Sequence, residues 1–163
     1  GIKLHPNDPY LWRDMGFTLL EANEFKESLS FFKKAYVLAP DDMKIGMPYA
    51  RRLRRECMYE EAEQLYMKYI PGADNTDSMK LLESLGILYF QKKEKGLAAA
   101  CLGQAILHGL QNSHAIEKYA ALNAQSFTLN DETWAAFANR LQAVLAPQKP
   151  VQSHMASYRP KPA

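Results

Sequence analysis

Residues 8–42 read DPYLWRDMGFTLLEANEFKESLSFFKKAYVLAPDD and form the most regular stretch of the chain. Apolar residues recur there at helical spacing on both sides of a short polar turn. Gly16 and Ser28 are small where two helix backbones would touch, and Trp12 and Phe32 are large enough to fill the space beside them. The stretch therefore predicts a pair of amphipathic helices packed against each other.

The same rhythm of small and aromatic residues recurs twice further along the chain. The three corresponding sets are Ser28, Phe32 and Ala35, then Ala62, Tyr66 and Tyr69, and finally Ala98, Leu102 and Ala105. One helix pair cannot bury its apolar face alone, so the recurrence predicts a stack of three pairs. The spacing is 34 residues and then 36, and we expect the two additional residues within the turn-rich residues 71–77.

Residues 8–42 resemble one tetratricopeptide repeat, a unit of about 34 residues with eight characteristic positions. The match is by identity at Trp12, Gly16, Phe32, Ala35 and Pro40, and by size at Met15, Leu19 and Ser28. The resemblance implies an all-α fold, a right-handed superhelix of antiparallel helix pairs closed by a C-terminal capping pair. We expect its helices at residues 9–22, 24–38, 42–56, 59–70, 76–91 and 94–108.

The expected organisation is a lead-in, one repeat domain and a tail. The lead-in is 1–8, the domain is 9–146, its repeats are 9–42, 43–78 and 79–112, and helices follow at 113–125 and 131–146. Those last helices would form a cap over residues 113–146, with a fourth repeat as the alternative. Residues 147–163 are rich in proline and are expected to be extended or disordered. Within them SHMAS resembles a vector-derived sequence; a native tail or a partner peptide joined by a cloned linker are the alternatives.

The second unit departs from the repeat pattern at the start of its first helix. Gly46, Met47 and Pro48 stand where the anchoring tryptophan of the first unit would be. A proline beyond the first turn removes a backbone hydrogen bond and clashes with the preceding turn. We therefore expect this helix to start late or to kink.

Composition indicates one folded domain with no general affinity for polyanions. The chain has 163 residues, 47% hydrophobic content and a formal net charge of +2. Cys57 and Cys101 have no neighbours at metal-ligand spacing, so both are expected to be small buried thiols in a reducing compartment. No secretory leader is recognisable, which favours the cytoplasm, although the sequence begins with Gly1 and upstream residues could be missing. The longest weakly polar run, residues 96–110, is too short to cross a bilayer.

The sequence offers no group of residues suited to catalysis. The four histidines are scattered, none has a second ligand at zinc-binding helical spacing, and no glycine-rich phosphate loop is present. The glutamates of residues 60–63 are expected on a solvated helix surface. We therefore expect no enzyme, no metal, no cofactor and no small-molecule substrate.

The resemblance to tetratricopeptide arrays implies that the first helix of each unit lines a concave groove. Carried over position by position, the candidate peptide-binding residues are Tyr10, Arg13, Phe17, Lys44, Met47, Arg51, Arg54, Arg55, Lys80, Ile87 and Phe90. Leu20, Glu21, Glu83 and Gln91 occupy the remaining inward positions. The basic residues would hold an acidic peptide through charge-assisted hydrogen bonds, and Tyr10, Phe17, Met47 and Phe90 would supply apolar anchors. A solvated basic face is the alternative, and Arg52 is predicted to point away from the groove.

The family's clamp for chaperone C-termini is matched only in part. Arg13 and Lys80 have its basic character, but Phe17 and Pro48 stand where the clamp needs asparagines. The predicted function is a protein-interaction scaffold or adaptor. Alternatives are a small secretion chaperone, similar in size and repeat count to type III translocator chaperones, and a structural subunit that self-assembles through its convex face or terminal helices. Nucleic-acid binding ranks third, because the arginine cluster favours it while the near-neutral total charge does not.

Overall fold

A computed structural model of the chain describes residues 5–107, 109, 114, 118, 121 and 122. Its helices are α1 (Pro9–Glu21), α2 (Phe25–Leu38), α3 (Met43–Arg55), α4 (Tyr59–Tyr69), the 3₁₀ turn η1 (Ile70–Gly72), α5 (Asn75–Gln91) and α6 (Lys95–Leu107). The described residues contain no strand, so the predicted all-α fold class is confirmed. The second capping helix and the tail lie outside the described residues. Of the first capping helix, positions 114, 118, 121 and 122 are described, and all are helical.

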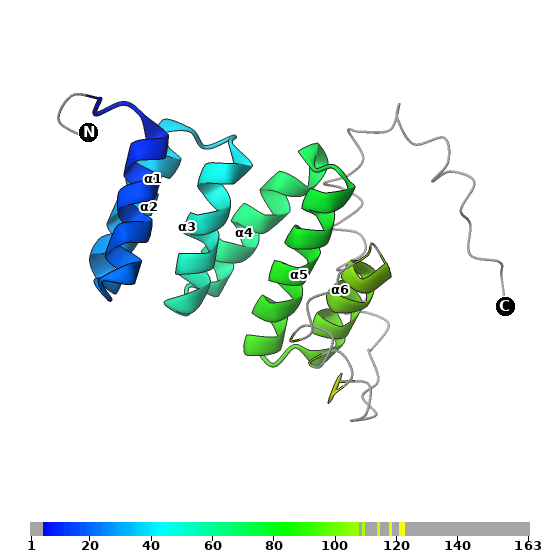
Figure 1. The fold of residues 1–163 in the computed structure, drawn as a ribbon. Coiled ribbons are helices and arrows are strands. Elements are labelled where there is room, and N and C mark those ends of the chain that lie inside the picture. Colours follow the sequence, from blue (N-terminus) through cyan, green and yellow to red (C-terminus); the bar gives the residue numbers. More distant parts are fainter. Residues whose placement is uncertain (1–4, 108, 110–113, 115–117, 119–120, 123–163) are drawn as a thin grey trace, which may run out of the picture.

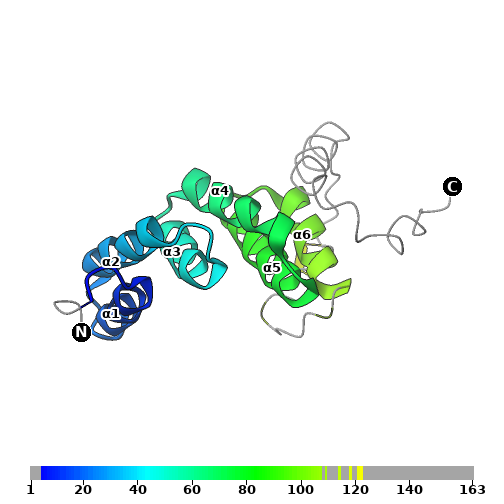
Figure 2. The ribbon, with the colours of Figure 1, turned by 90° about the horizontal axis from the view of Figure 1, so that it is seen from above.

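The helices form two layers. α1, α3 and α5 make up one layer and α2, α4 and α6 the other, as Figures 1 and 2 show from two directions. The chain alternates between the layers, and each helix packs mainly against its neighbours in sequence. The result is a row of three antiparallel helix pairs in which the first helix of every pair lies on the same side.

Aspartates fix where the first helix of each pair begins. The carboxylates of Asp8 and Asp42 accept the backbone amides of Tyr10 and Lys44, both at 2.9 Å. Asp74 accepts the amide of Asp77 at 2.7 Å. Each such cap stabilises a helix by about 1 kcal/mol. The caps explain why the observed starts of these helices lie within one residue of the predicted ones.

The turn inside each pair is closed by a residue with left-handed backbone geometry. These residues are Asn23, Cys57 and Lys93, with φ of 63°, 62° and 64°. They are 34 and then 36 residues apart, which is the spacing of the sequence repeat. Cys57 is exposed at its turn, so the expectation that it is buried is wrong, because a turn residue of this kind projects into solvent; Cys101, in contrast, is buried.

Glycines allow close approach within the first and third pairs. A Cβ on Gly16 would lie 2.8 Å from Cε1 of Phe32. A Cβ on Gly86 would lie 2.6 Å from Cγ of Leu102 and 3.2 Å from its backbone nitrogen. Phe32 and Leu102 are fully buried, so neither side chain has solvent to move into. The predicted close contact at Gly16 is confirmed, and Gly86 makes the equivalent contact in the third pair.

In the second pair a tyrosine takes the space of the missing tryptophan. A Cβ on Gly46 would overlap the hydroxyl of Tyr69, which reaches over from α4 and donates to the carbonyl of Pro40 at 2.7 Å. α3 begins at Met43, directly after its cap, so the expected late start is wrong. The cap holds the first turn, and the helix continues through Pro48 to Arg55.

The two junctions between pairs differ in chemistry. Between the first and second pairs, the rings of Tyr36 and Tyr49 stack with centroids 5.3 Å apart. Between the second and third, the Tyr89 hydroxyl donates to Glu63 at 2.7 Å, and the Lys92 ammonium lies 3.8 Å from the same carboxylate. Glu63 has a side chain only 14% exposed, so the expectation that it is solvated is wrong. α4 and α5 also touch less extensively than α2 and α3 do.

Candidate functional site

The exposed residues of α3 are all basic. Seven of its residues are buried and three are half-buried. The exposed ones are Lys44, Arg51 and Arg55. Separations of seven and four residues place these three on one side of an α-helix, over about 16 Å of its length at 1.5 Å per residue. Lys44, Arg51 and Arg55 are called the basic stripe below.

The charges of the basic stripe are unpaired within the part of the chain that the structure describes. Neither Lys44, Arg51 nor Arg55 makes an ion pair or a side-chain hydrogen bond with a described residue. Lys80 on α5 is also exposed and unpaired among these residues. Arg13 differs, because its guanidinium pairs with Asp14 at 2.7 Å. The stripe is therefore a cluster of positive charge open to an external anion.

The other two arginines of the cluster hold the fold together. Arg52 is 7% exposed, forms an ion pair with Glu56 and lies 5.0 Å from the ring centroid of Phe25; burial lowers its pKa. Arg54 donates to Oε1 of Gln91 at 2.8 Å and so joins α3 to α5. The Nε of Arg54 is buried without an acceptor among the described residues. Arg52, predicted to point away from the groove, is buried against Phe25, so reversing its charge cannot serve as a neutral control for binding.

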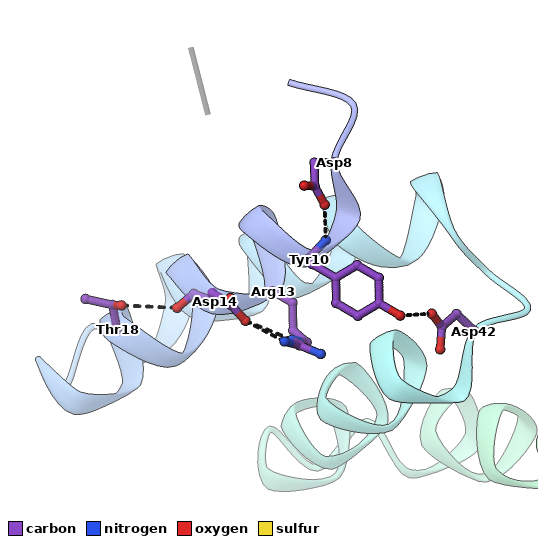
Figure 3. Close-up of polar contacts among 6 residues, drawn as sticks. All are labelled: Asp8, Tyr10, Arg13, Asp14, Thr18 and Asp42. Carbon is purple, nitrogen blue, oxygen red and sulfur yellow. Dashed lines mark hydrogen bonds and ion pairs between the residues drawn. The ribbon is translucent and has the colours of Figure 1, made fainter. Parts of the chain in front are cut away.

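At the start of α1, the predicted groove residues bind their own chain, as Figure 3 shows. The Tyr10 hydroxyl donates to the Asp42 carboxylate at 2.5 Å, and this hydrogen bond raises the pKa of Tyr10. The Arg13 guanidinium lies over the Tyr10 ring at 4.8 Å from its centroid while it pairs with Asp14. These contacts tie α1 to the start of α3, although Tyr10 keeps 39% exposure.

The predicted apolar anchors are only partly accessible. Phe17 is 41% exposed and rests edge-on against Phe32, with centroids 5.1 Å apart. Ile87 and Phe90 are half-buried, and the Lys118 ammonium lies 5.1 Å from the Phe90 ring centroid. Met47 is 5% exposed and belongs to the hydrophobic core. Its prediction as a surface anchor is wrong, because the side of α3 that carries it faces the interior.

A shallow cavity of about 270 Å³ lies away from these residues, where the α2–α3 and α4–α5 connections meet; it is lined by Asp41, Met43, Lys68, Tyr69, Gly72 and Asp77. Lys68 already has partners there: Asp41 at 3.3 Å and the Pro40 carbonyl at 3.0 Å. Its ammonium also lies 5.3 Å from the Tyr36 ring centroid. Sequence reasoning did not identify this cluster, because its members come from three helices and two connections without a common spacing.

Two further features of the described part of the chain bear on function. No group of three or more His, Cys, Asp or Glu residues is placed there to hold a metal ion. None of the helices described is long and apolar enough to cross a membrane.

No protein-family model and no curated protein matches the sequence. Solved structures do resemble the fold. The TPR domain of Arabidopsis OM64 superimposes with a TM-score of 0.64 at 17% identity, over 72% of this chain and 96% of that one. YrrB, described as a TPR protein with an unusual peptide-binding site, gives 0.61 at 20% identity over 94% and 75%. MamA (residues 41 to the end) from Desulfovibrio magneticus RS-1 gives 0.66 at 14% identity over 93% and 81%. At such identities the likeness establishes the fold: this chain has the fold of a tetratricopeptide-repeat protein.

Proposed function

We propose that this chain is a protein-interaction scaffold that binds a peptide segment of a partner protein on the face formed by α1, α3 and α5. The observation that carries the proposal is the basic stripe, the exposed residues of α3, whose three cations lack partners within the described residues. The other residues of α3 are buried or half-buried, so the stripe is the main surface that this helix presents to a ligand.

The chemistry of the stripe favours a ligand with carboxylates. Arginine forms bidentate, charge-assisted hydrogen bonds with carboxylates, which are roughly twice as strong as neutral ones. Phe17 of α1 and Ile87 of α5, at the positions that correspond to Arg51 by the repeat spacing, add apolar surface on the neighbouring helices. An acidic segment with some apolar side chains therefore fits this face better than a neutral polar one.

Two further observations support a binding role in a reducing compartment. The residues that the structure describes contain no metal-binding cluster, and the histidines are dispersed along the chain. Cys57 and Cys101 are not joined in a disulfide, and Cys57 is exposed at its turn, a state that persists where thiols are kept reduced. We accordingly assign the proposed activity to the cytoplasm.

Charge reversal on the basic stripe tests the proposal. Partners are captured from a lysate of the native host and then titrated calorimetrically against wild type and the double variant Arg51→Glu/Arg55→Glu. The matched control is Lys26→Glu/Lys33→Glu, which reverses the same number of exposed charges on α2, seven residues apart.

We expect the stripe variant to weaken binding about 30-fold or more, which corresponds to about 2 kcal/mol. The control should change affinity by less than about threefold, and that change should fade as salt is added. Equal losses of affinity in the two variants would mean that the stripe acts only as a diffuse basic surface, which contradicts the proposal. Unchanged affinity in both would place binding on another face and contradict the proposal.

A second candidate function is self-assembly through α2. This helix exposes large apolar side chains at Phe25 (46%), Val37 (68%) and Leu38 (40%). Equilibrium sedimentation of wild type and Val37→Asp would decide it: an oligomer that dissociates in the variant supports this candidate, and a wild-type monomer at high concentration excludes it.

A further inference from the structure

The geometry of the basic stripe indicates how a partner lies on it. We infer that the bound segment is an acidic amphipathic helix aligned along α3, rather than an extended peptide that crosses α1, α3 and α5. This inference rests on the proposed function and specifies the partner of the same face.

The first argument is spacing along the helix. Lys44 and Arg51 are separated by about 10 Å along the axis, and Arg51 and Arg55 by about 6 Å, at 1.5 Å per residue. A partner helix has the same rise, so carboxylates seven and four residues apart on one of its faces meet all three cations. An extended chain advances about 3.3 Å per residue and alternates sides, so two residues span the shorter gap but three are needed for the longer one. One of its carboxylates would then point away from the stripe.

The second argument is what a chain running across the layer would meet. At the level of Arg51, the corresponding positions are Phe17 on α1 and Ile87 on α5, both apolar. A crossing peptide would meet one cation there, with an apolar side chain on each side of it. At the level of Arg51 the positive charge therefore does not continue onto α1 or α5. At the level of Lys44 one further cation lies beside the stripe, Lys80 on α5, so most of the positive charge still runs along α3.

The residues beside Arg55, at the C-terminal end of the stripe, also favour a partner aligned along α3. At the level of Arg55, the corresponding positions are Glu21 on α1 and Gln91 on α5. Glu21 is exposed, and its carboxylate repels an acidic chain that continues from α3 onto α1. Gln91 is engaged by the guanidinium of Arg54. An acidic ligand thus gains most by staying over α3.

The apolar residues on α1 and α5 beside the stripe indicate what the rest of the partner's surface should carry. Phe17 of α1 is exposed beside the stripe, and Ile87 and Phe90 of α5 are half-buried on its other side. A complementary helix has a narrow stripe of Asp or Glu with apolar residues on both flanks. This arrangement uses helix-in-groove recognition, with the charges at the centre and the apolar contacts outside.

Two synthetic peptides of identical composition test the inference. Both have about 18 residues, form helices and contain leucines and three glutamates; in one the glutamates are seven and then four residues apart, and in the other five and five, which places them on three different faces. Each is titrated into the ¹⁵N-labelled protein, and dissociation constants come from amide shifts. A nitroxide at one end of the peptide then reports its direction through line broadening.

We expect the matched peptide to bind at least about tenfold more tightly than its isomer and to lose this advantage on Arg51→Glu/Arg55→Glu. Broadening should concentrate at one end of α3, near Lys44 or near Arg55. Broadening centred on α1 or α5 would overturn the alignment, and so would equal affinities for the two peptides. Failure of both peptides, with capture of the host partner still dependent on the stripe, would overturn the inference and leave the proposed function in place. Binding unaffected by the stripe variant would overturn both.

Discussion

Replacing Gly86 by alanine tests directly how closely α5 and α6 pack. The added Cβ would lie 2.6 Å from Cγ and 2.7 Å from Cδ2 of Leu102, and 3.2 Å from its backbone nitrogen. Because Leu102 is fully buried, the clash can be relieved only if the helices move apart or the leucine side chain leaves its rotamer. Overpacking of this kind costs about 1–3 kcal/mol. Alanine recovers roughly 0.5–1 kcal/mol because it lowers the entropic cost of the helix, so the net destabilisation should be about 0–2.5 kcal/mol.

The measurement is urea denaturation followed by circular dichroism, with Gly72→Ala as the control because a Cβ there meets nothing within 4 Å. The decisive comparison repeats Gly86→Ala in a Leu102→Ala background, where the two closest atoms are gone. There the substitution should be neutral, or stabilising by up to about 1 kcal/mol. An equal loss of stability in both backgrounds, or a raised Tm for the single variant, would refute the packing argument.

Three further substitutions have defined outcomes in the same denaturation assay. Lys93→Gly should raise the free energy of unfolding by about 0.5–1 kcal/mol, since left-handed geometry is unfavourable for lysine and not for glycine; a loss would mean that the lysine side chain stabilises the turn. Arg52→Glu should cost more than about 2 kcal/mol, because it places a second carboxylate beside Glu56 in a buried position; a change below about 0.5 kcal/mol would show that Arg52 is solvated. Tyr89→Phe should lower the free energy of unfolding by about 1.5–3 kcal/mol, because it removes the hydrogen bond to Glu63; an unchanged stability would mean that water replaces the tyrosine hydroxyl there.

The helices of the first three pairs could be predicted from sequence to within one residue at each described end. Their starts depend on local chemistry, such as the Asp8 and Asp42 caps, and their contacts on small residues such as Gly16, all of which a sequence displays. Gly86 follows Gly16 by one 34-residue and one 36-residue spacing, so the repeat spacing also indicates its close contact.

The face of α3 was harder to predict. Transfer of family positions placed Met47 in the groove, but Met47 is buried. The same transfer placed Arg52 outside the groove and gave no sign that it would be buried against Phe25. The transfer assumes that each pair packs like the first, whereas Gly46 lacks the anchoring side chain and Tyr69 fills the space from the next helix. Periodicity shows which residues share a helix face; it does not show how far a long side chain from another helix reaches.

The polar junction between the second and third pairs has a consequence for cooperativity. In a linear array, the free energy of each junction decides whether neighbouring units unfold together. Here α4 and α5 touch less extensively than α2 and α3 do, and the coupling between them depends in part on the hydrogen bond from Tyr89 to Glu63. Amide hydrogen exchange of Tyr89→Phe should therefore split into two protection classes, with α5 and α6 opening on their own while α1 to α4 still open as one unit.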